Sequence, residues 1–383
     1  MTTSARPGRL DAFGTTIFAE MSALAVRTGS VNLGQGFPDT DGPELMLEAA
    51  RRAIAEGRGN QYPPGPGVPE LRHAIADHQR DWYGLQVDPD AEVLVTVGAT
   101  EAIAAALLGL TQPGDEVVTF EPYYDSYAAC IALGGARRRV VTLRPDAGRW
   151  SFDEAELRAA ITPATRVLLL NTPHNPTGTV FTRAELVVLA GLAAEHDLVV
   201  VADEVYEHLV MAGEHVPIAT LPGMAERTVT ISSAGKTFSV TGWKVGWACG
   251  PAALLDRVRA VKQFLTFVGS GPFQYAVAEG LRLGPDFYAG AAEQLRLRRD
   301  LLTGGLARLG FEVLAPQATY FATIDLGGGA EAWCRALPER AGVVAIPTRV
   351  FYDSDVDRYA RLAFCKQPAI LAEALTRLEG VAR

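Results

Sequence analysis

A lysine at the end of a strand-like run is the first candidate for chemistry. Lys236 lies in the small-residue run Ser232-Ser-Ala-Gly-Lys-Thr-Phe238, which we expect to be a loop, directly after the apolar run Thr228-Val-Thr-Ile231. An ammonium group is strongly hydrated, so a buried strand end is a costly place for it without a partner. The partner can be a carboxylate in a salt bridge, or a carbonyl cofactor such as pyridoxal phosphate that binds the amine as an imine. Most lysines are surface charges, so the remaining candidates decide between these interpretations.

Four further side chains could hold the ring of such a cofactor. Asp203 follows an apolar run, and a carboxylate there needs a partner such as a pyridinium N–H, which makes the ring an electron sink. Tyr206 could hydrogen-bond the ring hydroxyl, and Asn175, in the segment 171–178 with its x-Pro turns, could donate to the same oxygen. Tyr124 could lie on the face of the ring. The plainer alternatives are a strand-end cap for Asp203, a turn for Asn175 and a core aromatic for Tyr124.

A phosphate site is indicated by two segments. The run Gly98-Ala99-Thr100 closes a strand and opens a helix, where free N–H groups and the helix dipole favour an anion. Ser233 and Lys244 would add a hydroxyl and a cation. The alternatives are an ordinary strand-to-helix turn with Thr100 as the N-cap, and a surface cation at Lys244.

The spacing of apolar runs predicts an α/β fold. Short β-branched runs alternate with helical patterns, which is typical of a mostly parallel sheet sandwiched by helices. The predicted strands are 93–97, 116–120, 138–143, 166–170, 198–202 and 228–232, and the predicted helices include 44–56, 69–83, 101–110 and 183–195. Because ligands bind beyond the carboxyl ends of such strands, the candidate residues should meet at one edge of the sheet.

The sequence pattern changes near residue 285, which predicts a second, smaller α+β domain. We divide the chain into an N-terminal segment, 1–40, that packs with the small domain, a large domain, 41–284, and the small domain, 285–383. The small domain should contain helices at 287–309 and 368–380 and strands at 311–314, 320–326, 343–347 and 359–364. Arg361, on the last of these strands, could bind a carboxylate through two parallel hydrogen bonds; the alternative is a surface charge on an edge strand.

Composition excludes several classes of function. The net charge of −9 and the absence of a basic stripe argue against nucleic acid as a partner. The four cysteines are scattered, and neither they nor the six histidines show metal-ligand spacing. No secretory signal and no uncharged apolar run of about 18 residues is visible. We therefore expect a cytoplasmic protein without a metal or a membrane span.

Several motifs in the sequence resemble those of a known family. The chain is similar to the class I/II pyridoxal-phosphate-dependent aminotransferases of fold type I, in the kynurenine/methionine aminotransferase branch. The motifs that carry this resemblance are 32–39 (NLGQGFPD), 60–62 (NQY), 171–178 (NTPHNPTG), 203–206 (DEVY) and 233–238 (SAGKTF). Within that branch, 18–25, 60–67 and 95–103 look most like actinobacterial N-succinyldiaminopimelate aminotransferases.

The resemblance implies a role for each candidate toward the cofactor, pyridoxal 5'-phosphate. Lys236 would form the internal aldimine. The other cofactor-binding residues would be Asp203 at the ring nitrogen, Asn175 and Tyr206 at the ring oxygen, Tyr124 on the ring face, and Gly98, Ala99, Thr100, Ser233 and Lys244 at the phosphate. Aspartate aminotransferases usually have arginine at the position of Lys244, and lysine keeps the charge but loses the bidentate geometry.

The resemblance also implies how substrate and partner subunit bind. Gly36 and Asn175 would lie against the substrate, and Arg361 would bind its α-carboxylate. Tyr62 would reach the phosphate of the other subunit, which implies a homodimer with shared active sites. The side-chain pocket would include the segment near Phe18, Tyr124 and partner residues near 265–272.

The predicted activity is transfer of an amino group between an L-amino acid and a 2-oxo acid such as 2-oxoglutarate, with Lys236 moving the α-proton. N-succinyl-LL-2,6-diaminopimelate, glutamine, methionine, an aromatic amino acid and kynurenine all remain open as donors. A C–S β-lyase acting on cystathionine or cysteine conjugates is the main alternative. An aminotransferase-like transcription regulator is disfavoured, because residues 1–40 are too short and Gly-rich for a DNA-binding helix-turn-helix.

Overall fold

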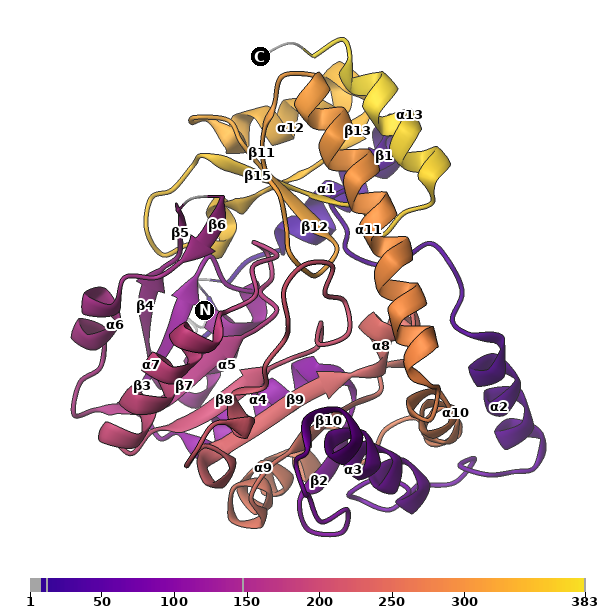
Figure 1. Cartoon of the computed structure of the whole chain (residues 1–383), viewed down its shortest axis with the longest axis vertical. Helices are drawn as coiled ribbons and strands as arrows, with labels where there is room; N and C mark the ends of the chain where they lie inside the picture. The colour runs from indigo at the N-terminus through magenta and orange to yellow at the C-terminus, as the bar shows by residue number, and fades with distance from the viewer. Residues whose placement is uncertain (1–7, 12, 147, 382–383) are drawn as a thin grey trace, which may run out of the picture.

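The computed structural model describes residues 8–11, 13–146 and 148–381. A seven-stranded sheet in the order β2-β10-β9-β8-β7-β3-β4 forms the centre of the larger part (Figure 1). Its strands are β2 (Val93–Thr96), β10 (Gly246–Cys249), β9 (Thr228–Ser233), β8 (Val199–Asp203), β7 (Thr165–Asn171), β3 (Glu116–Glu121) and β4 (Arg137–Thr142). All pairs from β9 to β4 are parallel, and β10 is antiparallel to both of its neighbours. The predicted mostly parallel sheet is confirmed, but the sequence analysis missed β10.

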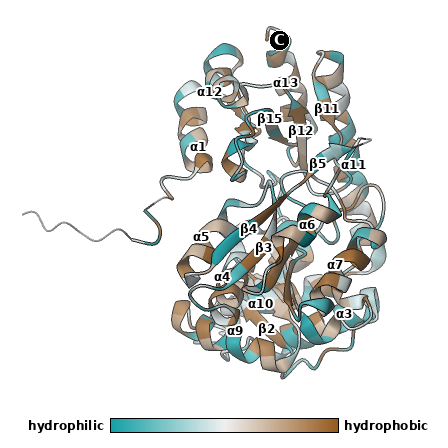
Figure 2. Cartoon of the chain, turned by 90° about the vertical axis from the view of Figure 1, so that its left-hand side faces the viewer, coloured by the Kyte–Doolittle hydropathy of each residue, from teal (hydrophilic) through white to brown (hydrophobic). Residues whose placement is uncertain are grey.

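Helices cover both faces of this sheet because its strands are apolar on both faces. On β7, Val167 and Leu169 belong to one buried cluster, and Leu168 and Leu170 belong to another. The helices of this part are α2 (Glu44–Ala55), α3 (Pro69–Tyr83), α4 (Gly98–Leu110), α5 (Asp125–Gly134), α6 (Glu154–Ala160), α7 (Arg183–Glu195), α8 (Ala234–Thr237), α9 (Ala252–Leu265) and α10 (Gly271–Leu281). Figure 2 shows the hydrophobic β3 beside the more hydrophilic edge strand β4.

Local signals explain several helix bounds. Thr182 and Glu185 form a capping box at the start of α7, which begins and ends where the sequence predicts. Gly84 adopts a left-handed conformation directly after α3, a common way for a helix to end. The helix predicted to start at 101 begins instead at Gly98.

A second, antiparallel sheet in the order β11-β12-β15-β14 lies beside the first part. Its strands are β11 (Glu312–Leu314), β12 (Phe321–Asp325), β15 (Tyr359–Ala363) and β14 (Ile346–Pro347). It packs with α11 (Pro285–Arg308), α12 (Ala330–Ala341) and α13 (Pro368–Leu378) around its own buried cluster. Figure 1 shows the long helix α11 running from the region of α10 up to this second sheet.

The N-terminal segment contacts the second part of the chain. Helix α1 (Ile17–Thr28) packs against residues of β13 (Val343–Val344), β14 and the turn that ends at Phe351, and β1 (Val31–Asn32) pairs in parallel with β13. The division into three segments stays a prediction. Within the described ranges, no helix combines the length and the apolar character needed to cross a membrane.

Candidate active site

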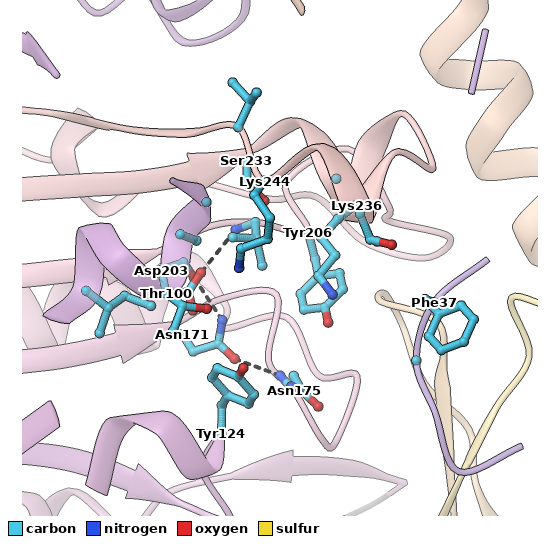
Figure 3. Close-up of a pocket in the computed structure, with 18 of the residues that line it drawn as sticks. Phe37, Thr100, Tyr124, Asn171, Asn175, Asp203, Tyr206, Ser233, Lys236 and Lys244 are labelled. Carbon is cyan, nitrogen blue, oxygen red and sulfur yellow. Dashed lines mark hydrogen bonds between the residues drawn. The ribbon is translucent and has the colours of Figure 1, made fainter. Parts of the chain in front are cut away.

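The carboxyl ends of the parallel strands open onto a cavity of about 310 Å³ (Figure 3). Most of the residues that the sequence analysis selected line it, namely Gly36, Gly98, Ala99, Thr100, Tyr124, Asn175, Asp203, Tyr206, Ser233, Lys236 and Lys244. They come from the ends of β2, β3, β7, β8 and β9, from the segments that follow these strands, and from the N-terminal segment. The topology therefore brings together residues that are far apart in the sequence, at the edge expected for a ligand site.

Lys236 lies on the four-residue helix α8, so the prediction of a loop at this position is wrong. The small residues before it let the chain turn directly from β9 into one helical turn. Its Nζ donates a hydrogen bond of 2.9 Å to the hydroxyl of Tyr320, which in turn donates to the carbonyl of Gly36 at 2.7 Å. Burial lowers the pKa of Lys236 to about 8, although the charge of Asp203 opposes this shift. A larger fraction of this amine is thus unprotonated near neutral pH than for an ordinary lysine.

Asp203 is the last residue of β8, and its side chain is only 4% exposed. Its carboxylate accepts hydrogen bonds from the hydroxyl of Tyr127 at 2.5 Å and from the amide of Val205 at 3.3 Å. Burial raises the pKa of Asp203 to about 6, and these hydrogen bonds oppose the rise. A buried carboxylate with free acceptor capacity favours a cationic N–H partner in the cavity.

Two asparagines connect Asp203 to the far side of the cavity. The Nδ2 of Asn171 donates to the backbone carbonyl of Asp203 at 2.9 Å. The Oδ1 of Asn171 accepts from the backbone N–H of Asn175 at 2.8 Å (Figure 3). The Oδ1 of Asn175 accepts from Arg361 at 2.9 Å. This contact commits the oxygen of Asn175 to the guanidinium, so its Nδ2 is the atom left to donate to a ligand.

Arg361 lies on β15, between β12 and β14, and is 2% exposed, so it is not an edge-strand surface charge. Its Nη2 donates to the carbonyl of Gly34 at 3.1 Å, and the guanidinium lies 3.9 Å from the centre of the Phe321 ring. Its buried Nε has no hydrogen-bond partner in the described part of the chain. Burial lowers the pKa of Arg361 to about 10. Such a buried cation with an unsatisfied donor is suited to a carboxylate ligand.

The segment that enters α4 forms a cradle at the other end of the cavity. Gly98 has a φ of +74°, and Gly246 of β10 packs so closely that a Cβ there would lie 2.6 Å from the Gly98 carbonyl carbon. The N-cap of α4 is Val97, so Thr100 lies within the first turn and is not the N-cap. Ser233 and Lys244 lie on one side of the cavity (Figure 3), and among the described residues Lys244 has no acidic partner within ion-pair distance.

Two predicted site residues do not line this cavity, namely Arg361, which contacts the lining residue Asn175, and Tyr62. The side chain of Tyr62 is 82% exposed and its ring packs edge-on against Phe267 at 5.4 Å between ring centres. The structure of one chain therefore does not bring Tyr62 to its own site.

Comparison with known proteins agrees with the fold and the cavity. Residues 28–378 match the family described as aminotransferase class I and II. The chain belongs to this family, and it is a pyridoxal-phosphate-dependent aminotransferase of fold type I. The resemblance inferred from the sequence motifs is confirmed.

The similar proteins and the solved structure described below align with nearly the whole chain. A Mycobacterium tuberculosis protein named "Probable N-succinyldiaminopimelate aminotransferase" is 52% identical over 389 residues, covering 98% of each chain. The methionine aminotransferase of Escherichia coli is 41% identical over 376 residues, covering 97% of each. The solved structure of N-succinyldiaminopimelate aminotransferase from M. tuberculosis has a TM-score of 0.95 at 53% identity, covering 98% of this chain and 99% of that one.

The residues present fit pyridoxal phosphate. Asp203 offers a buried carboxylate, and Lys236 offers an amine of lowered pKa. The turn into α4, where Gly246 leaves room against Gly98, offers backbone N–H groups beside the Lys244 ammonium. The Asp203 carboxylate matches an aromatic N–H, the Lys236 amine matches an aldehyde, and the turn into α4 with Lys244 matches a phosphate.

Three residues of the site were missed from the sequence. Tyr127 holds Asp203, and its position one helical turn after Tyr124 on α5 was a usable signal. Asn171 begins a motif that the sequence analysis quoted, but only Asn175 was selected from it. Tyr320, which contacts Lys236, stands at the start of a predicted strand and carried no local signal.

Proposed function

We propose that this aminotransferase binds its cofactor through the residues selected from the sequence and acts on an L-amino acid with a 2-oxo acid as acceptor. The observation that carries the proposal is the cavity that Lys236 shares with Asp203 and the α4 cradle, with Arg361 one contact away through Asn175. Pyridoxal phosphate supplies an aldehyde that binds amines covalently and a protonated ring that stabilises negative charge on the substrate α-carbon.

The residues on the cofactor side would each bind a part of the cofactor that matches their charge or hydrogen-bonding groups. The Asp203 carboxylate would hold the ring nitrogen, while Asn175 and Tyr206 donate to the ring oxygen and Tyr124 covers a face. Ser233, Lys244 and residues 98–100 would hold the phosphate. Their support is the shared cavity and the hydrogen bonds that fix Asp203 and Asn175 in place.

Lys236 would attach the cofactor and then carry the proton away from the substrate α-carbon. A general base works best when its pKa lies near the operating pH, and burial lowers the pKa of this amine to about 8. The 2.9 Å hydrogen bond to Tyr320 gives the amine a defined position.

The α-carboxylate of the substrate would bind Arg361, next to Gly36. A Cβ at Gly36 would lie 2.2 Å from Cζ of Phe321, so only glycine keeps this part of the loop against the second sheet. Arg361 lies 3.9 Å from the centre of the same Phe321 ring, so Gly36 and Arg361 both pack against this ring.

We further propose a homodimer in which the Tyr62 of each subunit completes the phosphate site of the other. The support is Phe267, which packs against Tyr62 and is 51% exposed, together with Phe264, three residues earlier in the chain, which is 85% exposed. Exposed aromatic clusters of this kind are typical of interfaces. The four cysteines are unpaired and buried, which suits the reducing cytoplasm.

For the donor we propose N-succinyl-LL-2,6-diaminopimelate, in a biosynthetic reaction, because the relatives at 52% and 53% identity carry that substrate in their names. A panel of donors, with 2-oxoglutarate and pyruvate as acceptors, tests this. The succinylated donor should have the highest kcat/KM, with 2-oxoglutarate consumed in equal amount. A higher value for methionine or kynurenine would overturn the substrate, and pyruvate and ammonia released from cystathionine without an acceptor would indicate a β-lyase.

A further inference from the structure

A second group of ligand-forming side chains lies outside the cofactor cavity. His78 is on α3, and Glu207 and His208 are on the turn 205–208 that follows β8. The Nε2 atoms of the two histidines face each other at 2.6 Å, with the rings nearly perpendicular. One ligand atom of each of the three residues lies within 4.8 Å of the other two. None of the three lines the cofactor cavity.

This set of atoms has the chemistry of a metal site. Two imidazole nitrogens that face each other must share either a proton or a cation, and Glu207 places a carboxylate beside them. Two histidines and one carboxylate are a ligand set that Zn²⁺ and similar divalent metals prefer. The ligand atoms of a tetrahedral zinc site lie about 3.3 Å apart, so the two nitrogens would have to separate by well under an ångström.

Surrounding groups hold the three ligands in place. The Glu207 carboxylate accepts hydrogen bonds from the hydroxyl of Tyr83 at 2.7 Å and from the hydroxyl of Ser232. Such outer hydrogen bonds orient metal ligands in proteins. The rings of Trp82 and Tyr288 pack against His208 at 4.7 and 4.2 Å between ring centres.

Hydrogen bonds within the protein leave this cluster incomplete. His78 is 3% exposed, and its buried Nδ1 has no partner in the described part of the chain. A buried imidazole retained only for structure would be expected to satisfy both nitrogens. The unpartnered Nδ1 is not the proposed ligand atom, so a cation is indicated by the facing Nε2 atoms and by the Glu207 carboxylate beside them.

An entry path leads to the cluster from outside. Glu207 and His208 line a cavity of about 440 Å³, together with Tyr83 and His215. His215 is occupied by a 3.0 Å contact with Glu204. This cavity therefore gives water and ions a route to Glu207 and His208.

We propose that His78, Glu207 and His208 bind one divalent transition metal, with Zn²⁺ as the type, and leave the fourth position open to this cavity. The metal would connect α3 to the turn 205–208, which carries Tyr206 and follows Asp203, and would stabilise that turn next to the cavity that Tyr206 lines. The sequence carried no metal motif because His78 and His208 are separated by 130 residues. This proposal does not depend on the identity of the amino donor.

The test uses the untagged, full-length holoenzyme after dialysis against a chelator, in a buffer free of amino acids. Titration calorimetry with ZnCl₂ should give one site per chain. Free Zn²⁺ at about a hundredfold excess over Kd should raise Tm by about 3–6 °C. Co²⁺ in place of Zn²⁺ should give visible d–d absorption at wavelengths longer than the cofactor bands.

The variants His78→Gln and Glu207→Gln should weaken Zn²⁺ binding at least about tenfold, while His73→Gln, an exposed histidine on the same helix, should leave it unchanged. Because a variant could fold poorly, the Co²⁺ spectrum of the unmodified enzyme is an independent readout. No saturable binding and no Co²⁺ band in that enzyme would overturn the proposal and leave a simple histidine–histidine hydrogen bond. Equal affinity in His73→Gln and His78→Gln, both folded, would also overturn it.

Discussion

The two sides of the cofactor cavity are built differently. On the cofactor side, Asp203 and Ser233 end neighbouring strands of one buried sheet, and Asn175 follows a third strand. On the substrate side, Arg361 comes from a different sheet, and Gly36 comes from the N-terminal segment. The contact between the sides runs through a few hydrogen bonds, such as that between Arg361 and Asn175. Under the proposed roles, the cofactor chemistry would rest on one sheet, whereas substrate recognition would depend on how a second sheet is placed against it.

Because of this difference, substitutions on the two sides should change different kinetic constants. Changes on the cofactor side should lower kcat or cofactor affinity, because in the proposed function the affected groups act on the reacting atoms. Changes on the substrate side should mainly raise KM, because the groups proposed there would bind the substrate in the ground state and the transition state alike.

The largest effect is expected for Lys236→Ala. The variant loses both the cofactor attachment and the proton carrier, so kcat should fall at least about 10,000-fold. Steady-state transamination measures this, with cofactor content checked separately. A small primary amine added to the assay should restore part of the activity if the lysine acts as a base. Turnover close to that of the unmodified enzyme would remove Lys236 from the mechanism.

Asp203→Asn should lower kcat by about 100- to 1,000-fold, with a smaller change in KM. A neutral amide cannot balance a positive ring nitrogen in a buried site, so the transition state loses electrostatic stabilisation. Single-turnover kinetics with a saturating donor measures the step. Asn171→Ala is a useful comparison, because it removes the hydrogen bonds to the Asp203 carbonyl and from the Asn175 backbone amide but leaves the Asp203 carboxylate in place. The assignment of Asp203 fails if both variants have the same small effect.

On the substrate side, Arg361→Lys should raise KM of the amino donor about 10- to 100-fold and change kcat less. Lysine keeps the charge but loses the paired donors, and a hydrogen bond to a charged group contributes about 1.5–3 kcal/mol. Initial rates over a range of donor concentrations separate the two constants. A fall in kcat at unchanged KM would place Arg361 on the cofactor side of the comparison.

The lowered pKa of Lys236 predicts a pH profile. In the cofactor-free enzyme, the neutral amine forms as pH rises toward about 8. The rate of covalent capture of pyridoxal should therefore increase about tenfold per pH unit below that value and level off above it. Pyridoxal is the better probe because it lacks a titrating phosphate. A rate that keeps rising to pH 10 would show that burial does not lower the pKa of this amine.

The smallest effect is expected for Tyr127→Phe. This variant removes the hydroxyl that donates to Asp203 at 2.5 Å, and Kd of the cofactor should rise about three- to tenfold while kcat at saturation changes little. Equilibrium dialysis or fluorescence titration measures Kd. Tyr123→Phe is the matched control, because the Tyr123 hydroxyl donates to Asp353 and not to Asp203. Equal effects of the two variants would argue against a specific role for Tyr127.

The same comparison explains how much of the site could be predicted from the sequence. Residues that follow buried strands, such as Asp203, are marked by the apolar run before them, and parallel topology brings those strand ends together. Tyr320 is not marked in this way, because its contact with Lys236 depends on the packing of the second sheet. In the proposed homodimer, the position of Tyr62 relative to a cofactor site would depend on a second chain.

The errors in predicting β10 and α8 have local causes. Strand β10 is four residues long and follows a tryptophan- and glycine-rich stretch, so its apolar pattern is too short to stand out. Helix α8 is a single turn of small residues, for which composition favours a loop. By contrast, α7 combines a capping box with a periodic apolar pattern, and its bounds agree with the prediction.

The attachment of the cofactor to Lys236 is the claim on which the rest depends. Reduction of the holoenzyme with borohydride, followed by proteolysis and mass spectrometry, locates the amine that holds the cofactor. The account predicts one pyridoxyl-modified residue per chain, at Lys236. Modification of a different lysine, or no modification of an enzyme that retains activity, would contradict it.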